Sequence, residues 1–181
     1  MKPNLSVFFP AFNEEENITS LVTSAYELLK EIAEQFEIII VDDGSRDRTS
    51  FIVKELAIRY PEVRLIQHSH NLGYGAALIS GFKHCRYELV FFSDADNQFC
   101  LRDLRGFLGL IQDCDAVLGY RKKRSDSLFR SINTWAWTLL VNILFRIRIK
   151  DVNCAFKLFR KSKNCRPAVF CYKYSFESLF I

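Results

Sequence analysis

Short apolar runs alternate along this chain with longer segments whose apolar residues recur every three or four positions. The runs are rich in β-branched or aromatic residues and are bounded by turn residues, which is typical of buried strands. They lie at residues 5–9, 38–41, 63–67, 88–92 and 116–119. The first long segment carries an apolar helical face that begins at Ile18 and is expected to reach Phe36. Such alternation predicts an α/β fold, a mostly parallel sheet flanked by helices.

A further helix is predicted after Gly119, at residues 132–147. This segment is apolar on most faces, carries both tryptophans of the chain and has basic residues at its two ends. An aromatic, apolar body with basic ends is typical of a helix at a membrane interface. A core helix whose C-terminal charges suit its dipole shows the same pattern, and we favour the interface.

The chain of 181 residues has the length of one domain, and with 49% hydrophobic and 25% charged residues it is able to bury a core. We expect residues 1–160 to form that domain, with residues 122–150 supplying a basic loop and the interfacial helix. Residues 161–181 form a tail that ends on apolar residues, and we interpret this tail as the product of a truncation.

Charge and cysteine content indicate which partners and which cellular compartment suit this protein. Basic side chains outnumber acidic ones 14 to 3 over residues 119–181, which favours an anionic partner, although a solvated basic face has the same composition. The 6 cysteines show no Cys-x-x-Cys spacing, which argues against a zinc site and favours a reducing compartment. Since no signal peptide precedes the first strand and no apolar run could span a bilayer, we expect a cytoplasmic protein, at the cytoplasmic face of a membrane.

Two carboxylates, Asp94 and Asp96, directly follow the predicted strand at residues 88–92. In an open α/β sheet, ligands bind at the carboxyl ends of the strands. Two neighbouring carboxylates repel each other, and a divalent cation is the usual remedy. The first hypothesis is therefore a metal ion held over the sheet edge, ready to meet a phosphate, and we rank it above helix capping by these two acids.

Three other predicted strand ends also carry more than ordinary turn residues. After the first strand, the flat ring of Phe12 could wall a base or ribose, while the acids that follow it suit a helix N-terminus. After the second strand, Asp42 or Asp43 could accept hydrogen bonds from a base imino group or a ribose hydroxyl, although a turn also uses Asp and Gly. After the third strand, residues 73–75 form a Gly-x-Gly pattern that a tight turn explains better than a phosphate site.

The motifs at these strand ends occur in one order along the chain, at residues 10–15, 41–45, 71–75, 94–98, 119–121 and 151–160. In this order they resemble family-2 glycosyltransferases of the GT-A fold, and they look most similar to the dolichyl-phosphate mannose synthase-like branch. The resemblance covers about residues 4–160. It implies a metal-dependent hexosyltransferase that uses a nucleotide-diphosphate sugar as donor.

The resemblance also implies the roles of individual residues. The base and ribose of the nucleotide would be lined by Pro10, Phe12, Glu14, Val41 and Asp43. The sugar diphosphate would lie beside Asp94, Ala95 and Asp96. Mg²⁺ or Mn²⁺ would be ligated by Asp96 and Gln98, with Asp94 nearby. Phosphate groups of the donor or acceptor would be contacted by Arg121, and the lipid phosphate by Arg130. The catalytic residues would be Asp94, Asp96 and Arg121.

The implied reaction is inverting transfer of a sugar to a polyprenyl phosphate of the dolichyl type. The sequence independently favours a phosphate acceptor, because an alcohol acceptor needs a general base whereas a phosphate is already anionic. After Gly119 the chain has few acids, namely Asp126, Asp151 and Glu177. We therefore expect a nucleotide-sugar donor, a polyprenyl-phosphate acceptor and peripheral membrane contact, and no nucleic acid.

Other functions fit parts of the same pattern. A non-catalytic, nucleotide-sugar-binding remnant would keep the metal site without turnover. A nucleic-acid-binding domain would use the basic C-terminal region, but that region lacks a recognition motif, and the acidic strand ends would repel phosphate without a metal. A nucleotidyltransferase would also pair acids with a metal, yet it would need a basic, Gly-rich loop after the first strand, where this chain has acids.

Overall fold

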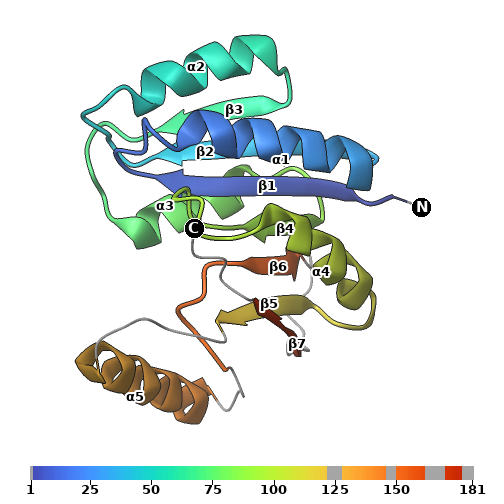
Figure 1. The fold of residues 1–181 in the computed structure, drawn as a ribbon, viewed down its shortest axis with the longest axis vertical. Helices are drawn as coiled ribbons and strands as arrows, with labels where there is room; N and C mark the ends of the chain where they lie inside the picture. Colours follow the sequence, from blue (N-terminus) through green and yellow to red (C-terminus); the bar gives the residue numbers. More distant parts are fainter. Residues whose placement is uncertain (1, 122–127, 146–149, 162–169, 177–181) are drawn as a thin grey trace.

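The computed structural model describes residues 2–121, 128–145, 150–161 and 170–176, in which strands and helices alternate (Figure 1). The strands are β1 (Asn4–Ala11), β2 (Gln35–Asp42), β3 (Val63–Gln67), β4 (Leu89–Phe92), β5 (Ala116–Arg121), β6 (Lys157–Arg160) and β7 (Phe170–Phe176). The α-helices are α1 (Ile18–Ile32), α2 (Thr49–Arg59), α3 (Tyr74–His84), α4 (Leu104–Leu110) and α5 (Leu128–Phe145). Two short 3-10 helices, η1 (Leu101–Asp103) and η2 (Ile111–Asp113), flank α4.

The described strands form one 7-stranded sheet in the order β3-β2-β1-β4-β6-β5-β7. The half that contains β3, β2, β1 and β4 is parallel throughout, which confirms the predicted α/β class and its mostly parallel sheet. β6 runs antiparallel to both β4 and β5, while β7 pairs with β5 in parallel. The antiparallel strand β6 therefore joins the parallel half of the sheet to its last two strands.

Helices cover both faces of the parallel half (Figure 1). The residues of β1 alternate between the two faces: Val7 and Phe9 pack with α1, α2 and α4, whereas Phe8 packs with α3. All three side chains are almost completely buried. Because β1 and β4 are buried on both faces, their sequences are nearly continuous apolar runs rather than alternations of apolar and polar residues.

The first helix ends earlier than its apolar pattern predicts. α1 stops at Ile32, the next residue takes an extended conformation, and Phe36 belongs to β2, so the expectation that the helical face reaches Phe36 is wrong. The backbone N–H of Glu34 donates to the carbonyl oxygen of Pro3, and Gln35 then pairs with Asn4 in the sheet. Pairing with β1 therefore takes precedence over the local helical periodicity.

β1 lies where the order of the strands reverses. From β1 the chain adds β2 and then β3 on one side, and it later returns to place β4 on the other side of β1. Loops that leave neighbouring strands at such a point turn toward opposite faces of the sheet and leave a crevice between them. The residues after β1, β2 and β4, where the sequence predicts a ligand site, all lie at this carboxyl edge.

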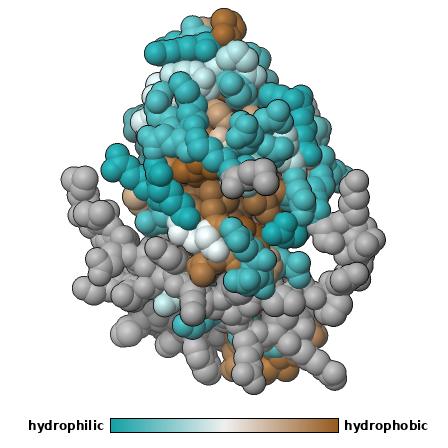
Figure 2. Space-filling view, turned by 90° about the vertical axis from the view of Figure 1, so that its right-hand side faces the viewer, coloured by the Kyte–Doolittle hydropathy of each residue, from teal (hydrophilic) through white to brown (hydrophobic). Residues whose placement is uncertain are grey.

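At the opposite, amino-terminal edge of the sheet, the buried carboxylate of Glu37 is surrounded by hydrogen-bond donors. Ser6 Oγ donates to Oε1 at 2.7 Å, the backbone N–H of Arg86 donates to the same oxygen at 2.6 Å, and Arg64 Nη2 donates to Oε2 at 2.8 Å. These bonds join β1, β2, β3 and the segment before β4. Figure 2 views the molecule from this side, where hydrophilic groups surround a central hydrophobic area.

Figure 1 shows α5 set apart from the sheet. The helix begins at Leu128, somewhat earlier than predicted, and several of its apolar side chains are exposed: Trp137, Leu139, Leu140, Ile143 and Leu144. Within the described ranges, no helix combines the length and the apolar character that crossing a membrane requires.

Two glycines of α3 allow a matched test of how this helix packs. A Cβ at Gly81 would overlap the ring of Phe8, whereas a Cβ at Gly75 would have no neighbouring atom within 4 Å. We expect Gly81→Ala to lower the free energy of unfolding by about 2 kcal/mol, because an added methyl group forces the packed core apart. Gly75→Ala should raise it by about 0.5–1 kcal/mol through helix propensity. Urea unfolding measures both, and equal effects would contradict the close packing of α3 on β1.

Candidate functional site

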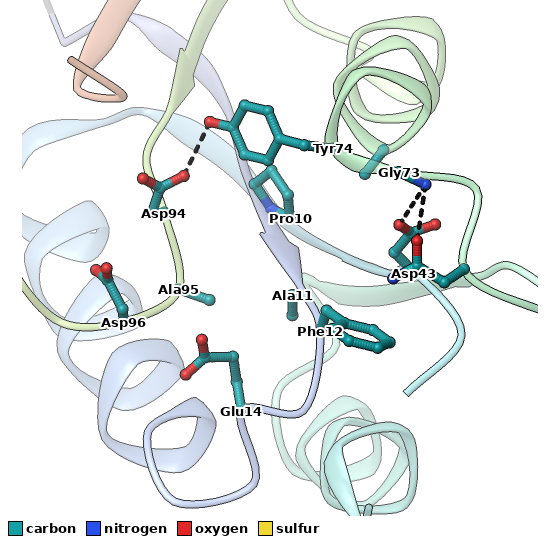
Figure 3. A pocket seen from close by; sticks show the side chains of 12 residues that line it. Pro10, Ala11, Phe12, Glu14, Asp43, Gly73, Tyr74, Asp94, Ala95 and Asp96 are labelled. Carbon is teal, nitrogen blue, oxygen red and sulfur yellow. Dashed lines mark hydrogen bonds between the residues drawn. The ribbon is translucent and has the colours of Figure 1, made fainter. Parts of the chain in front are cut away.

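A pocket of about 390 Å³ lies at the carboxyl ends of β1, β2 and β4 (Figure 3). It occupies the crevice that the reversal of strand order creates. Its walls come from the loops that follow β1, β2 and β4 and from the start of α3. The lining residues are Pro10, Ala11, Phe12, Glu14, Asp43, Asn71, Gly73, Tyr74, Ala77, Asp94, Ala95 and Asp96.

The carboxylate of Asp43, just after β2, binds the loop that leads into α3. Its Oδ1 accepts hydrogen bonds from the backbone N–H of Leu72 at 2.9 Å and contacts His68 Nδ1 at 2.7 Å, while its Oδ2 accepts from the N–H of Gly73 at 2.9 Å (Figure 3). Burial acts to raise the pKa of Asp43, but these hydrogen bonds outweigh it and hold the pKa below its usual value. Asp43 is therefore a carboxylate at neutral pH.

Gly44 lets this loop approach Asp43 closely. Its φ is +73°, in the left-handed region that favours glycine, and a Cβ at this position would overlap the backbone of His70 and Asn71. A side chain at Gly44 would thus push the loop away from β2. The Asp-Asp-Gly sequence at the end of β2 therefore forms a turn and also allows the loop after β3 to pack against it.

The loop after β1 presents the ring of Phe12 beside Asp43 (Figure 3). The ring is 43% exposed, and Pro10 precedes it at the end of the buried strand. Next to it, the backbone N–H of Asn13 donates to Ser45 Oγ at 2.9 Å and that of Glu14 donates to Thr49 Oγ1 at 2.8 Å. These bonds hold the loops after β1 and β2 together, so that Phe12 remains at the mouth of the pocket with its ring open to a ligand.

The other side of the pocket is acidic. Glu14, Asp94 and Asp96 extend into it from the loops after β1 and β4 (Figure 3). Asn97, which follows Asp96, takes a positive φ and donates through Nδ2 to Ser20 Oγ at 2.8 Å, so the loop after β4 is fastened to α1. Carboxylates that face the same pocket repel one another, which makes this side suited to a cation.

Tyr74, at the start of α3, orients Asp94 from across the pocket. Its hydroxyl donates to Asp94 Oδ1 at 2.9 Å (Figure 3). Burial of the hydroxyl, and then the charge of Asp94, raise the pKa of Tyr74 well above its usual value. The phenol therefore stays protonated at physiological pH and acts as a hydrogen-bond donor to the carboxylate.

The acidic residues fit a divalent cation that is shared with a ligand. Within the described ranges, no three His, Cys, Asp or Glu side chains gather into a metal cage. Mg²⁺, however, commonly binds one or two carboxylates together with phosphate and water, and Asp94 and Asp96 offer oxygen donors of this kind to one pocket. Gln98 is exposed and does not line the pocket; its backbone N–H donates to Asp96 Oδ1 at 3.1 Å.

A lysine lies behind the acidic side of the pocket. Lys157 of β6 pairs with Phe92 of β4, and its Nζ donates to the carbonyl oxygen of Val152 at 2.9 Å. Burial lowers the pKa of Lys157, and the nearby acidic groups, Cys154, Asp151 and Asp94, act in the opposite direction. The antiparallel strand thus brings a cation close to Asp94 from a part of the chain far away in sequence.

Most of the residues that the sequence singled out gather around this one pocket: Pro10, Phe12, Glu14, Asp43, Asp94, Ala95 and Asp96. Val41 is completely buried in the core under α3, so its part in nucleotide binding stays a prediction. Arg121 ends β5 and Arg130 belongs to α5, and their side chains lie outside the described part of the structure.

Sequence reasoning did not single out Tyr74, His68 or Lys157. Tyr74 stands inside the Gly-x-Gly pattern, whose position after a strand could have pointed to it. His68 lies outside the sequence motifs, and Lys157 lies inside the motif at residues 151–160 but was given no role of its own. Both reach the site only through contacts between distant segments.

Comparison with known proteins agrees with this geometry. A model of the family described as Glycosyl transferase family 2 matches residues 6–176. A dolichyl-phosphate beta-glucosyltransferase of Trichomonas vaginalis is 32% identical in an alignment 183 positions long, which covers 88% of this chain and 55% of that protein. A dodecaprenyl-phosphate galacturonate synthase of Rhizobium johnstonii is 30% identical over 162 residues, which cover 87% of this chain and 48% of that protein. The chain thus spans about half the length of these relatives.

A solved structure shows the same fold. The mannosyltransferase PcManGT of Pyrobaculum calidifontis, in complex with GDP-Man and Mn²⁺, superimposes with a TM-score of 0.64 at 22% identity. The match covers 88% of this chain and 45% of that one. The likeness confirms the predicted GT-A fold.

The lowered pKa of Asp43 allows a test of its hydrogen bonds. The stabilisation from the ionised form is fully present above the unfolded pKa of about 3.9, and it is lost as the pH falls through the lower folded value. We expect Asp43→Asn to reduce the free energy of unfolding by about 1–3 kcal/mol at neutral pH. The difference from wild type should be constant down to about pH 4 and narrow below it. Urea unfolding across this range measures it.

Asp113→Asn, at an exposed position of η2, is the control and should leave the free energy of unfolding unchanged. A difference between Asp43→Asn and wild type that persists undiminished in strong acid would contradict the lowered pKa of Asp43.

Proposed function

Because this chain belongs to glycosyl transferase family 2, we propose that it transfers a sugar from a nucleotide-diphosphate donor to a polyprenyl phosphate of the dolichyl type. One observation carries the proposal: the pocket has an aromatic and carboxylate end, Phe12 with Asp43, and an acidic end, Asp94 with Asp96. The names of the relatives, a dolichyl-phosphate beta-glucosyltransferase and a dodecaprenyl-phosphate galacturonate synthase, support this choice of acceptor.

The base and ribose would occupy the end formed by Phe12 and Asp43. The exposed ring of Phe12 offers a flat apolar surface to a nucleobase. The ionised carboxylate of Asp43 accepts hydrogen bonds only, so it suits a base imino N–H or a ribose hydroxyl. Pro10, near the end of β1, completes this end, Glu14 would reach it from the acidic side, and Gly73 allows the ligand to approach the backbone.

The sugar diphosphate would lie at the acidic end, beside Asp94, Ala95 and Asp96. A bound Mg²⁺ or Mn²⁺ would neutralise the charge that develops on the leaving nucleotide diphosphate. Asp94 and Asp96 would hold this cation, and the Tyr74 hydroxyl would keep Asp94 in the required orientation. Ala95 is almost completely buried between the two acids, so its small side chain leaves room for the sugar.

The acceptor phosphate would attack the anomeric carbon of the sugar and displace the nucleotide diphosphate with inversion. An anionic phosphate needs no general base, so the residues of the pocket have to bind and orient the two substrates rather than remove a proton. We assign the binding of the acceptor phosphate to Arg121, at the end of β5, and Arg130, in α5. Lys157 would partly balance the negative charge of Asp94 from behind.

A polyprenyl acceptor stays in a membrane, so the enzyme has to reach a membrane surface. The described side chains of α5 include exposed Leu140, Ile143 and Leu144, which are 53%, 67% and 70% accessible, together with Trp137. We assign this apolar surface to peripheral contact with a bilayer. We place the contact at the cytoplasmic face, because the four cysteines whose side chains the structure describes, Cys85, Cys100, Cys114 and Cys154, are free thiols.

Transfer assays test the reaction directly. The purified chain should move sugar from one member of a panel of labelled nucleotide-diphosphate sugars to a short polyprenyl phosphate when Mg²⁺ or Mn²⁺ is present. Asp94→Asn and Asp96→Asn should each reduce the rate at least about a hundredfold, and removal of the metal with a chelator should abolish it. Asp113→Asn, on the exposed surface of η2, should leave the rate unchanged.

Transfer to a soluble sugar alcohol and none to the polyprenyl phosphate would rule out the proposed acceptor. Metal-dependent binding of a nucleoside diphosphate without any transfer would instead identify the chain as a non-catalytic, nucleotide-sugar-binding protein.

Flotation with lipid vesicles tests the membrane contact. Ile143→Glu should reduce the bound fraction severalfold, because it places a charge in the apolar surface of α5. Ile58→Glu is the matched control: Ile58 of α2 is 85% exposed but belongs to a different helix on the far part of the sheet, and this change should have no effect. Equal binding of both variants and the wild type would remove α5 as the contact surface.

A further inference from the structure

Three side chains from different elements form a chain of hydrogen bonds that ends at the pocket. Ser80 comes from α3, His68 follows β3, and Asp43 follows β2. The distance between Ser80 Oγ and His68 Nε2 is 2.9 Å, and the distance between His68 Nδ1 and Asp43 Oδ1 is 2.7 Å. The imidazole is largely buried, with 10% of its side chain exposed.

The partners of His68 determine which of its nitrogens carries the proton. Asp43 is ionised and can only accept a hydrogen bond, so the proton must be on Nδ1 of His68. In the neutral imidazole, Nε2 is then an acceptor and takes the hydrogen bond from the Ser80 hydroxyl. The short contact between Nδ1 and Oδ1 is a charge-assisted hydrogen bond, which belongs to the stronger class of such bonds in proteins.

The order Ser80, His68, Asp43 has the connectivity of a nucleophilic triad, but the surroundings argue against that role. Neither Ser80 nor His68 is among the residues that line the pocket, so a substrate there meets only Asp43. A nucleophilic serine has to be open to its substrate and must face oxyanion donors. The hydrogen bonds of Ser80 and His68 therefore act on Asp43, which is the one residue of the three that lines the pocket.

The carboxylate of Asp43 has a limited number of acceptor positions, about four for its two oxygens. Oδ1 receives His68 and the N–H of Leu72, and Oδ2 receives the N–H of Gly73. Among the hydrogen bonds of the described residues, this leaves one acceptor position, on Oδ2. Without the bond from His68, the carboxylate could rotate, and the position that a ligand meets would change.

We propose that His68 is a positioning residue for nucleotide binding: it holds Oδ1 of Asp43 so that Oδ2 presents a single acceptor position to the base or ribose of the donor. The inference rests on the proposed function, because it assigns the nucleoside to the end of the pocket at Asp43. His68 itself touches no ligand and acts through Asp43.

Two substitutions separate the two hydrogen bonds of His68. The side-chain nitrogen of Asn lies as many bonds from the backbone as Nδ1 does, so His68→Asn keeps a donor for Asp43 and loses Ser80. The side-chain nitrogen of Gln corresponds to Nε2, so His68→Gln keeps a partner for Ser80 and loses the donor to Asp43. His68→Leu removes both hydrogen bonds at a similar size.

The dissociation constants of uridine, guanosine, cytidine and adenosine diphosphates, measured by calorimetry with Mg²⁺, are the first readout. For the nucleotide that binds most tightly to the wild type, His68→Gln and His68→Leu should weaken binding about tenfold, while His68→Asn stays within about twofold. Inorganic pyrophosphate with Mg²⁺ is the control ligand, and its affinity should be equal in all variants because it has no nucleoside. Equal nucleotide affinity in all three variants would overturn the proposal.

A second readout needs no ligand and keeps the two proposals distinguishable. In the free protein, the amides of Leu72 and Gly73 should exchange faster with solvent in His68→Gln and His68→Leu than in wild type or His68→Asn, and ¹⁵N spectra should show the proton of His68 on Nδ1. A proton on Nε2, or unchanged exchange, would overturn the role of His68. Failure of the wild type to bind any nucleoside diphosphate, with the exchange result as expected, would overturn the proposed function and confine His68 to ordering the loop.

Discussion

The hydrogen bonds that converge on the Asp43 carboxylate hold together the loops after β2 and β3, at the end of the pocket that Phe12 and Asp43 form. They arise because a polar residue at the end of a buried strand must find partners, and here the partners are backbone N–H groups of the next loop. Gly44, where a Cβ would overlap the backbone of that loop, allows it to come close enough, and Gly73 within the loop takes a positive φ. The buried carboxylate of Glu37, at the other edge of the sheet, is likewise satisfied by hydrogen bonds from the protein itself: from Ser6, Arg64 and the backbone of Arg86. Asp43 differs because it also faces a cavity, so the residues that satisfy it decide what remains for a ligand.

The charge of the pocket follows from the same strand ends. Loops after β1 and β4 bring Glu14, Asp94 and Asp96 to one side, where a diphosphate alone would be repelled. A bound cation would resolve this conflict. Tyr74 contributes a neutral donor that fixes Asp94 without removing its charge. The two ends of the pocket thus differ: hydrogen bonds determine the structure around Asp43, whereas negative charge is the main property of the end at Asp94 and Asp96.

The sequence predicted the strands that are buried on both faces, because their composition alone distinguishes them from helices, and it predicted Asp43, Asp94 and Asp96 because strand ends of a parallel sheet meet at one edge. It could not predict β6, which has no apolar run and becomes a strand through pairing with β4 and β5. The extension of α1 to Phe36 failed for the related reason that pairing with β1 began first. His68 and Asp43 are 25 residues apart, and their contact forms only when β2, β3 and α3 pack together. No local sequence pattern could therefore predict it.

The antiparallel strand β6 lies between two parts of the chain that differ in charge. The parallel half, from β1 to β4, is acidic at its carboxyl edge and suits a donor held through a cation. The chain after Gly119 is rich in basic residues and suits the phosphate of the acceptor. β6 pairs with β4 on one side and with β5 on the other, and it places Lys157 against Phe92, close to Asp94. The chain after Gly119 therefore contributes a basic side chain, Lys157, close to an acid of the parallel half, so the two parts of the chain differ in charge where they meet.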